Sequence, residues 1–184
     1  MNTFSYRSGF TLVEMVITIL LIGIVSAVAL SRMLSADAYN AINVREGVIS
    51  AFQMAQQRAI GHADVVLTFQ PDGDELSVLL EGDGAALVPE TRLPLASVTI
   101  AAEVDVLDAC DTISPDSDNI LSDVKPLIVE FDALGDMLSS GVVDGNPANP
   151  VDVNTGMRIC INEDPVMSLC ISKLGYAYAG ACDD

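Results

Sequence analysis

The sequence has few aromatic residues and no tryptophan. Aromatic residues make up 5% of its 184 residues, although 51% of the residues are hydrophobic. This composition favours a helix and a small sheet of aliphatic side chains over a large aromatic-lined pocket. At this length, one membrane segment leaves room for one modest globular domain.

Basic residues are also scarce, with 8 lysines and arginines against 26 aspartates and glutamates. Residues 1–63 carry four arginines and three acids, whereas residues 64–184 carry four basic and 23 acidic side chains. The second part therefore has a net charge of −19. A domain this acidic repels phosphate backbones, so direct nucleic-acid binding is disfavoured, and the charge is expected to keep the domain soluble.

Motifs for catalysis and for cofactor binding are missing. The sequence contains no G-x-S-x-G, no H-E-x-x-H and no glycine-rich phosphate loop, and its one histidine, His62, is far from the cysteines. Acidic residues between Asp108 and Asp123 are of the type that binds Ca²⁺, but they lack EF-hand spacing, and we interpret them as a solvated loop. We expect no enzyme activity, no metal site and no cofactor.

Cysteines occur only in the second part of the chain, and none forms a C-x-x-C pair. They are Cys110, Cys160, Cys170 and Cys182. An even number in this part predicts two disulfides in an oxidising compartment. A hairpin expected near the C-terminus favours a cross-strand Cys160–Cys170 bond, which leaves Cys110 with Cys182; the other two pairings stay open.

Long apolar runs are limited to one, from Phe10 to Leu30, in which Glu14 is the only charged residue among 21. That length suits a helix crossing a bilayer. A carboxylate inside such a segment costs about 2.5–3.5 kcal/mol and is normally kept only with a partner. An ordinary signal peptide cut after Ala29 is the alternative, but Glu14 would then lie inside its apolar region.

A polar leader, residues 1–9, precedes this run, and its single Arg7 favours a cytoplasmic location for that end. After the run, the helical period continues to residue 60 with one apolar face, formed by Met33, Ala36, Ile42, Ile49, Phe52, Gln56 and Ala59. No proline interrupts residues 10–70, and Gly61 is placed to cap the helix. We predict one helix over about 10–60 whose second half packs on the globular domain.

Beyond Gly61 the pattern changes to short strands. We expect strands over 65–69, 76–80, 97–106, 127–131, 157–161 and 168–172, and loops over 82–94, 108–126 and 139–156. A helix followed only by such strands predicts an antiparallel sheet packed on one helix face, an α+β fold. The expected domains are a leader (1–9), a transmembrane and assembly half of the helix (10–30), its amphipathic half (31–61) and a globular β domain (62–184).

The run Gly-Phe-Thr-Leu-Val-Glu at residues 9–14, with the apolar helix after it, resembles the type IV prepilin motif that type II secretion pseudopilins share. The resemblance implies the type IV pilin fold. It also implies that a prepilin peptidase cuts between Gly9 and Phe10 and N-methylates Phe10, and that Glu14 pairs with that amine in a neighbouring subunit. Ser31 departs from the pattern, because many relatives carry a helix-breaking proline there.

Two C-terminal stretches resemble particular members of this family. Residues 128–135 are similar to the strand and turn of the minor-pseudopilin H and FimT-like group, and residues 159–182 to the final sheet of C-type minor pilins of the mannose-sensitive haemagglutinin (MSHA) system. These similarities imply a structural minor pilin acting in pilus assembly, at the fibre tip or in cell adhesion. The alternative is a minor pseudopilin of a type II secretion system.

The resemblance also implies partners and a location. The partners are the prepilin peptidase and other pilins, which join through the N-terminal helix in a hetero-oligomeric fibre. The precursor is expected in the inner membrane with its C-terminal domain in the periplasm, and the processed subunit in a pilus at the cell surface. A FimT-type role in DNA uptake predicts a basic surface, which the charge of −19 opposes.

Overall fold

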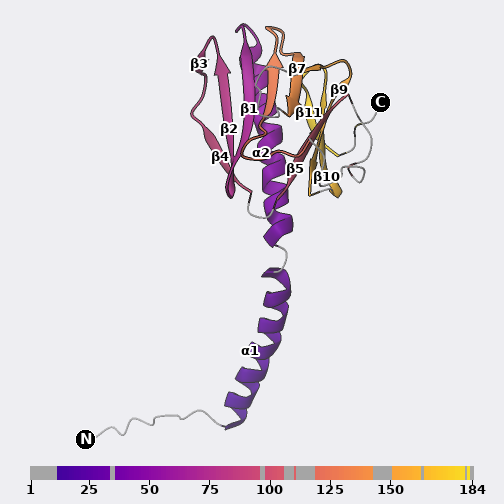
Figure 1. Cartoon of the computed structure of the whole chain (residues 1–184). Helices are drawn as coiled ribbons and strands as arrows, with labels where there is room; N and C mark the ends of the chain where they lie inside the picture. The colour runs from indigo at the N-terminus through magenta and orange to yellow at the C-terminus, as the bar shows by residue number, and fades with distance from the viewer. Residues whose placement is uncertain are drawn as a thin grey trace, which may run out of the picture. The chain divides into compact units, whose positions relative to one another are not determined.

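The computed structural model describes residues 12–33, 36–95, 98–105, 110, 119–142, 151–162, 164–180 and 182. Contacts divide the chain into two compact units, residues 1–36 and 37–184. Helix α1 (Leu12–Met33) lies in the first unit. The second, the globular unit, contains α2 (Ala36–Ala59) from Asp37 onward and the described strands (Figure 1). Because residues 34 and 35 lie outside the described residues, a single helix over about 10–60 stays a prediction.

Helix α2 buries one face in the globular unit. Its buried residues, spaced by three or four, are Ala41, Val44, Val48, Phe52, Ala55 and Ala59. The predicted face was correct at Phe52 and Ala59 but wrong at Ile42, which is exposed; the side chains of Met33 and Ala36 are not described. The helix ends at Ala59, and Gly61 follows in the capping position expected for it, with a φ of +88° that glycine adopts without a Cβ penalty.

The first sheet has the strand order β3-β2-β1-β6-β7-β8, with β4 also paired to β2, and neighbouring strands are antiparallel. Its strands are β1 (Val65–Asp72), β2 (Glu75–Gly82), β3 (Ala85–Ala86), β4 (Thr91–Pro94), β6 (Leu127–Phe131), β7 (Met137–Val142) and β8 (Val151–Asp152). The predicted hairpin of β1 and β2 is confirmed, with Asp72 opposite Glu75. Strand β6 is confirmed as well.

Loops predicted on both sides of β6 contain strands. β3 and β4 fall within residues 82–94, and β8 with most of β7 falls within residues 139–156. These strands are short or rich in Ser and Gly, so they show little of the alternating apolar pattern that indicates a strand. They form because neighbouring strands offer ladder partners, β2 for β3 and β4, β6 for β7, and β7 for β8, which is a tertiary rather than a local cause.

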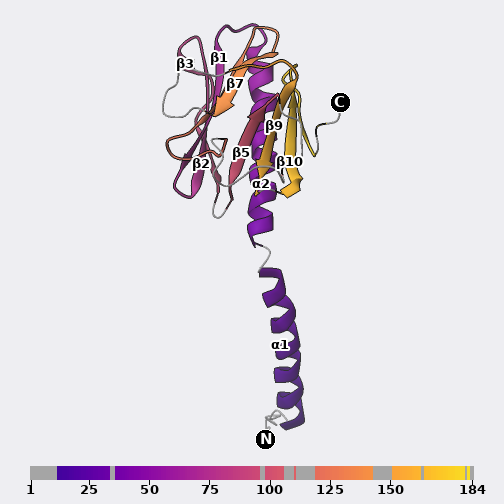
Figure 2. The ribbon, with the colours of Figure 1, turned by 45° about the vertical axis from the view of Figure 1, so that its right-hand side comes forward.

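The second sheet has the order β11-β10-β9-β5 and is also antiparallel (Figure 2). Its strands are β5 (Ile100–Val104), β9 (Gly156–Ile161), β10 (Asp164–Ser172) and β11 (Ala177–Ala179). The hairpin expected near the C-terminus is confirmed as β9 and β10. The α+β class is confirmed too, but the strands form two sheets rather than the single sheet expected, because β5 pairs with β9 and not with the strands on either side of it in sequence.

One hydrophobic core joins α2 to both sheets. Phe52 of α2 lies at its centre, with ring centroids 5.5 Å from Phe69 of β1 and 6.3 Å from Phe131 of β6. From the second sheet, Ile159 and Leu169 enter the same core and are almost fully buried. The helix therefore organises the unit, since residues of both sheets converge on its apolar face.

Two disulfides are present, but the favoured pairing was wrong. Cys110 bonds Cys160 and Cys170 bonds Cys182, with Cα–Cα distances of 5.7 and 5.2 Å. The register explains the difference, because Cys170 lies opposite Arg158 and not opposite Cys160. A diagonal pair in an antiparallel ladder has its side chains about 7–8 Å apart, too far for an S–S bond. Cys160 lies opposite Ala101 of β5 instead, and the two residues form a buried cluster with Cys110.

Candidate processing and assembly site

Glu14 lies in the first turn of α1 and is exposed. A carboxylate is favourable there because the N-terminal turn of a helix carries partial positive charge. The large apolar side chains around it are also exposed: Leu12, Val13, Met15, Val16, Ile17, Ile19, Leu20, Leu21, Ile22, Ile24 and Val25. A helix that is apolar on all sides is typical of one surrounded by lipid or by other helices. Gly9 and Phe10, the expected cleavage pair, lie outside the described residues.

Hydroxyl groups in α1 bond back to the helix itself. Thr18 Oγ1 donates to the carbonyl of Met15 (2.8 Å), and Ser26 Oγ donates to the carbonyl of Ile22 (2.7 Å). These bonds satisfy the polar groups inside the helix, as an apolar environment requires. They were not predicted, although Ser and Thr inside an apolar helical run are a usable signal.

No helix in the described part of the chain is both long enough and apolar enough to span a membrane.

The similarity to a known family lies in the N-terminal region of the chain. Residues 4–30 match the family model of the prokaryotic N-terminal methylation motif. The match includes Gly9, Phe10 and Glu14, and it supports a type IV prepilin or pseudopilin, processed by a prepilin peptidase and assembled in association with the membrane. No curated protein and no solved structure is significantly similar to the chain.

The globular unit has an apolar groove of about 200 Å³ between α2 and the first sheet. It is lined by Gly47, Ser50, Ala51, Met54, Leu67, Val78, Leu80, Val88, Thr91 and Leu93. None of these side chains titrates, so the groove offers no acid or base. A Cβ on Gly47 would lie 2.6 Å from Cδ1 of Leu93, so the side chain of Leu93 approaches the helix closely at this glycine.

The candidate metal ligands do not form a site in the described structure. Among the described residues, no group of three or more His, Cys, Asp or Glu side chains is placed to hold a metal ion. His62 is exposed just after α2, and its backbone N–H donates to the carbonyl of Ala59 (3.0 Å). Most of the acidic loop between Asp108 and Asp123 lies outside the described residues.

Asp105 is a polar centre that was not predicted. Its carboxylate accepts hydrogen bonds from the backbone N–H of Thr155 (2.7 Å) and of Asn154 (2.9 Å), and from both side chains. Burial alone would raise the pKa of Asp105, but these hydrogen bonds hold it well below its usual range. These hydrogen bonds join the end of β5 to the turn before β9. Because the partners are about fifty residues apart in sequence, no local sequence pattern predicts the bonds.

We expect Asp105→Ala to lower the free energy of unfolding by about 1 kcal/mol at pH 7, since charge-assisted hydrogen bonds are lost but are weakened by solvent screening at this exposed residue. The pKa of Asp105 is lower in the folded protein than in the unfolded chain, where it is about 3.9. The ionised carboxylate therefore stabilises the fold fully above about pH 3.9, and this stabilisation is lost as the pH falls below that value. Denaturant unfolding of the full-length chain at pH 7 and at about pH 2.5 should therefore show a smaller difference between variant and wild type at the lower pH. Asp123→Ala, the same change at another exposed acid, is the control; an equal loss there at pH 7 contradicts the prediction.

Proposed function

We propose that this chain is a structural minor pilin of an MSHA-like type IV pilus, made as a prepilin and incorporated through its N-terminal helix. The observation that carries the proposal is the methylation-motif match over residues 4–30. The α+β fold, with an N-terminal helix ahead of antiparallel sheets, agrees with it. Its role is assembly rather than catalysis.

Processing is proposed at the bond between Gly9 and Phe10. Gly9 places the smallest side chain before the scissile bond, and cleavage there by prepilin peptidase gives Phe10 a free amine, which the same enzyme methylates. The leader that precedes it has one positive charge, Arg7, which favours a cytoplasmic location for the cleavage site.

Assembly is proposed to depend on Glu14. In the precursor, residues 10–30 anchor the chain in the inner membrane, with the globular unit in the periplasm, where an oxidising environment suits its two disulfides. In the fibre, the Glu14 carboxylate pairs with the Phe10 amine of an adjoining pilin. Such a pair offsets two charges that would each be costly in an apolar helix bundle.

Two substitutions test these steps separately in cells that produce the chain. Gly9→Arg should abolish cleavage and Phe10 methylation, as gel mobility and N-terminal mass spectrometry report. Glu14→Gln should leave both intact but lower incorporation into purified fibres at least about tenfold, because an unpaired buried ammonium costs more than the ~1.4 kcal/mol of a tenfold change. Glu46→Gln, the same change at an exposed acid paired with Arg45, is the control.

Each arm has an outcome that refutes it. Normal cleavage and methylation of Gly9→Arg removes the prepilin interpretation, and an N-terminus at Leu30 supports a secretory signal peptide instead. Incorporation of Glu14→Gln at the level of Glu46→Gln removes the pairing role of Glu14 while leaving the processing step standing.

A minor pseudopilin of a type II secretion system is the second candidate. The methylation motif fits it equally, and the strand and turn of residues 128–135, now seen as β6 and the turn after it, resemble the minor-pseudopilin H group. Deleting the gene distinguishes the two functions. Loss of surface pili with normal secretion supports the pilin, and the reverse supports the pseudopilin.

A further inference from the structure

Two hairpins of the globular unit have turns of the same construction. After β6, the N–H of Gly135 donates to the carbonyl of Asp132 (3.0 Å); after β10, the N–H of Gly175 donates to the carbonyl of Ser172 (2.9 Å). Both glycines have positive φ, +90° and +76°. In each turn the residue before the glycine is a leucine.

These leucines are exposed, and they belong to one patch. Leu134 is 77% exposed, and Leu174 and Ile60, at the end of α2, are each 63% exposed. Gln56 Nε2 donates to the carbonyl of Leu174 (2.6 Å), and a Cβ on Gly135 would lie 3.7 Å from Cγ1 of Ile60. We call Ile60, Leu134 and Leu174 the turn patch.

The turn patch is unusual for its place in the fold. Turns favour Gly, Asn, Asp, Pro and Ser, whose conformations and hydrogen bonds suit them. A single exposed leucine needs no explanation, but three large apolar side chains from three elements, gathered around one junction, are the mark of an interaction site. None of the three contributes to the buried core, so folding does not account for them.

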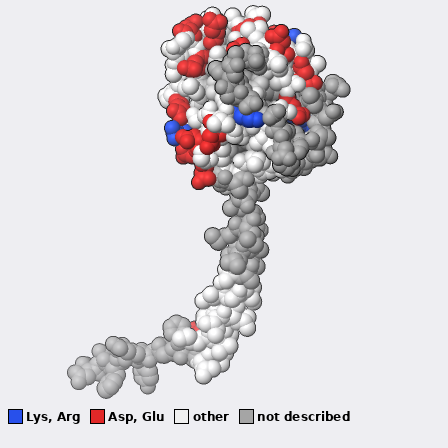
Figure 3. Space-filling model, in the orientation of Figure 1, with Lys and Arg blue, Asp and Glu red and all other residues white. Residues whose placement is uncertain are grey.

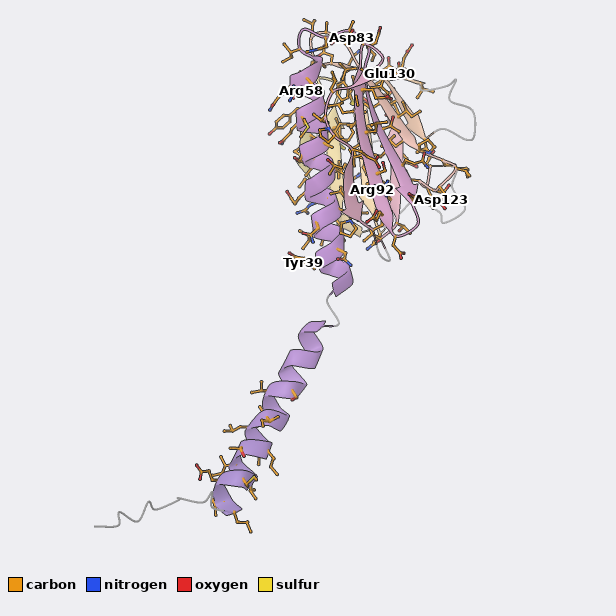
Figure 4. The ribbon with its side chains drawn as sticks, turned by 90° about the vertical axis from the view of Figure 1, so that its left-hand side faces the viewer. Tyr39, Arg58, Asp83, Arg92, Asp123 and Glu130 are labelled. Carbon is orange, nitrogen blue, oxygen red and sulfur yellow. A yellow bond between two sulfur atoms is a disulfide. The ribbon has the colours of Figure 1, made fainter. Side chains whose placement is uncertain are left out.

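The surroundings of the turn patch are acidic. The loop after α2 joins the first turn through the N–H of Gly61, which donates to the carbonyl of Ala133 (3.3 Å), and the N–H of Asp83 donates to the carbonyl of Ala63 in the same loop (3.4 Å). These bonds place the exposed Asp83 and Asp64 at the same end of the unit. Figure 4 shows Asp83 and Glu130 at the end where α2 terminates, with Arg92 and Asp123 farther along the sheet.

Exposed basic side chains lie near the turn patch as well, but the acids at this end, Asp64, Asp83, Asp132 and Asp136, outnumber them. Arg92 is engaged by Asp72, Glu75 and Glu90, at 3.9, 3.3 and 3.1 Å. Figure 3 shows acidic side chains spread over the visible face of the globular unit, with few Lys or Arg among them. At the end of the unit that carries the turn patch, Arg58 in the last turn of α2 and Lys173 in the second turn are exposed basic residues (Figure 4).

We propose that the turn patch binds a different polypeptide whose contact surface has an apolar centre and a basic rim. Charge complementarity selects this occupant, because an acidic rim attracts a basic surface and repels the acidic unit of a second copy, as well as anionic lipid. The contact uses no residue of α1, so it goes beyond assembly into a fibre and does not depend on which secretion or pilus system uses the chain.

Site-specific photo-cross-linking of the full-length chain in its producing cells tests the proposal. Benzoylphenylalanine is placed at Leu134 or Leu174, and at Val124 as a control that is 70% exposed in another loop. We expect cross-links from the two turn positions, and not from Val124, to peptides of another polypeptide that contain Lys or Arg beside apolar residues. With the probe at Leu174, Leu134→Asp should lower the yield at least about tenfold.

The acidic rim is tested by charge reversal. Asp83→Lys should lower the yield at Leu174 about threefold, whereas Asp123→Lys should leave it unchanged. The side chains of Leu134, Asp83 and Asp123 are exposed, but Asp83 has a φ of +52°, which lysine tolerates less well than aspartate. Asp83→Asn, which removes the charge and suits this conformation, is therefore measured beside it and should also lower the yield at Leu174, at the unfolding temperature of the wild type. The proposal is overturned by no cross-link, by cross-links only to a second copy or to phospholipid, by an equal yield at Val124, or by a yield that Asp83→Lys does not change.

Discussion

Removal of the Cys110–Cys160 disulfide, as Cys110→Ala with Cys160→Ala, is expected to lower the free energy of unfolding by about 4 kcal/mol. The two cysteines are 50 residues apart in sequence, so their bond restricts a long loop in the unfolded chain. Both side chains are nearly fully buried, against Ala101 and beside Ile120, in a cluster separate from the shared core. Their loss also removes packing in that cluster.

The second disulfide is a matched control. Cys170 and Cys182 are only 12 residues apart, and the same loop-closure relation gives about 3 kcal/mol. Denaturant unfolding of the full-length chain in detergent micelles, without reductant, should rank Cys110→Ala/Cys160→Ala below Cys170→Ala/Cys182→Ala. The reverse order, or a loss under about 1 kcal/mol for the first variant, would show that the bond does not constrain the unfolded chain as expected.

Gly175→Ala is expected to destabilise the protein by about 2–5 kcal/mol, from two sources that add. A φ of +76° costs a non-glycine residue about 1–2 kcal/mol. In addition, a Cβ at this position would lie 2.4 Å from the carbonyl oxygen of Gly135 and 3.3 Å from Cε1 of Phe131. The oxygen is backbone and the ring is in the core, so neither can move freely, and overpacking adds about 1–3 kcal/mol.

Gly84→Ala measures the cost of the positive φ without the cost of overpacking. Gly84 has the same φ of +76°, but a Cβ there has nothing within 4 Å. Gly84→Ala should lower the free energy of unfolding by about 1–2 kcal/mol. The further loss in Gly175→Ala then measures the close contact between the two hairpin turns. Equal losses of unfolding free energy in denaturant titrations would mean that the turns separate easily and that their close approach contributes little.

Local signals predicted a large part of this fold. The hairpin of β1 and β2 followed from alternating apolar residues around Pro71–Asp74, and the helix end followed from Gly61. These features depend on residues a few positions apart. Strand β7 was missed because Ser139, Ser140 and Gly141 carry no strand pattern and pair only because β6 is beside them.

Long-range features could not be predicted in the same way. The disulfide pairing depended on which residue of β9 lies opposite Cys170, and sequence does not specify that register. The division into two sheets depended on β5 pairing with a strand more than fifty residues later. The Asp105 centre has the same origin, because its partners are 49 to 51 residues away.

The N-terminal site differs because its chemistry is contained in consecutive residues. The roles of Gly9, Phe10 and Glu14 were predicted from the sequence alone and stay predictions; the family-model match covers all three residues. Their pairing between subunits is a relation between chains, so it stays a prediction. The turn patch was not predicted, because its three residues come together only in the folded unit.

The position of α2 in the shared core has a mechanical consequence. Side-chain packing and the hydrogen bond from Gln56 hold the sheets to this helix, whereas the two disulfides lie within the second sheet and the segments that adjoin it. Tension applied along the helix would therefore load contacts that can break and re-form. The segments joined by the disulfides would stay attached to the second sheet under that load, and this sheet would keep its part of the surface on which the helix packs.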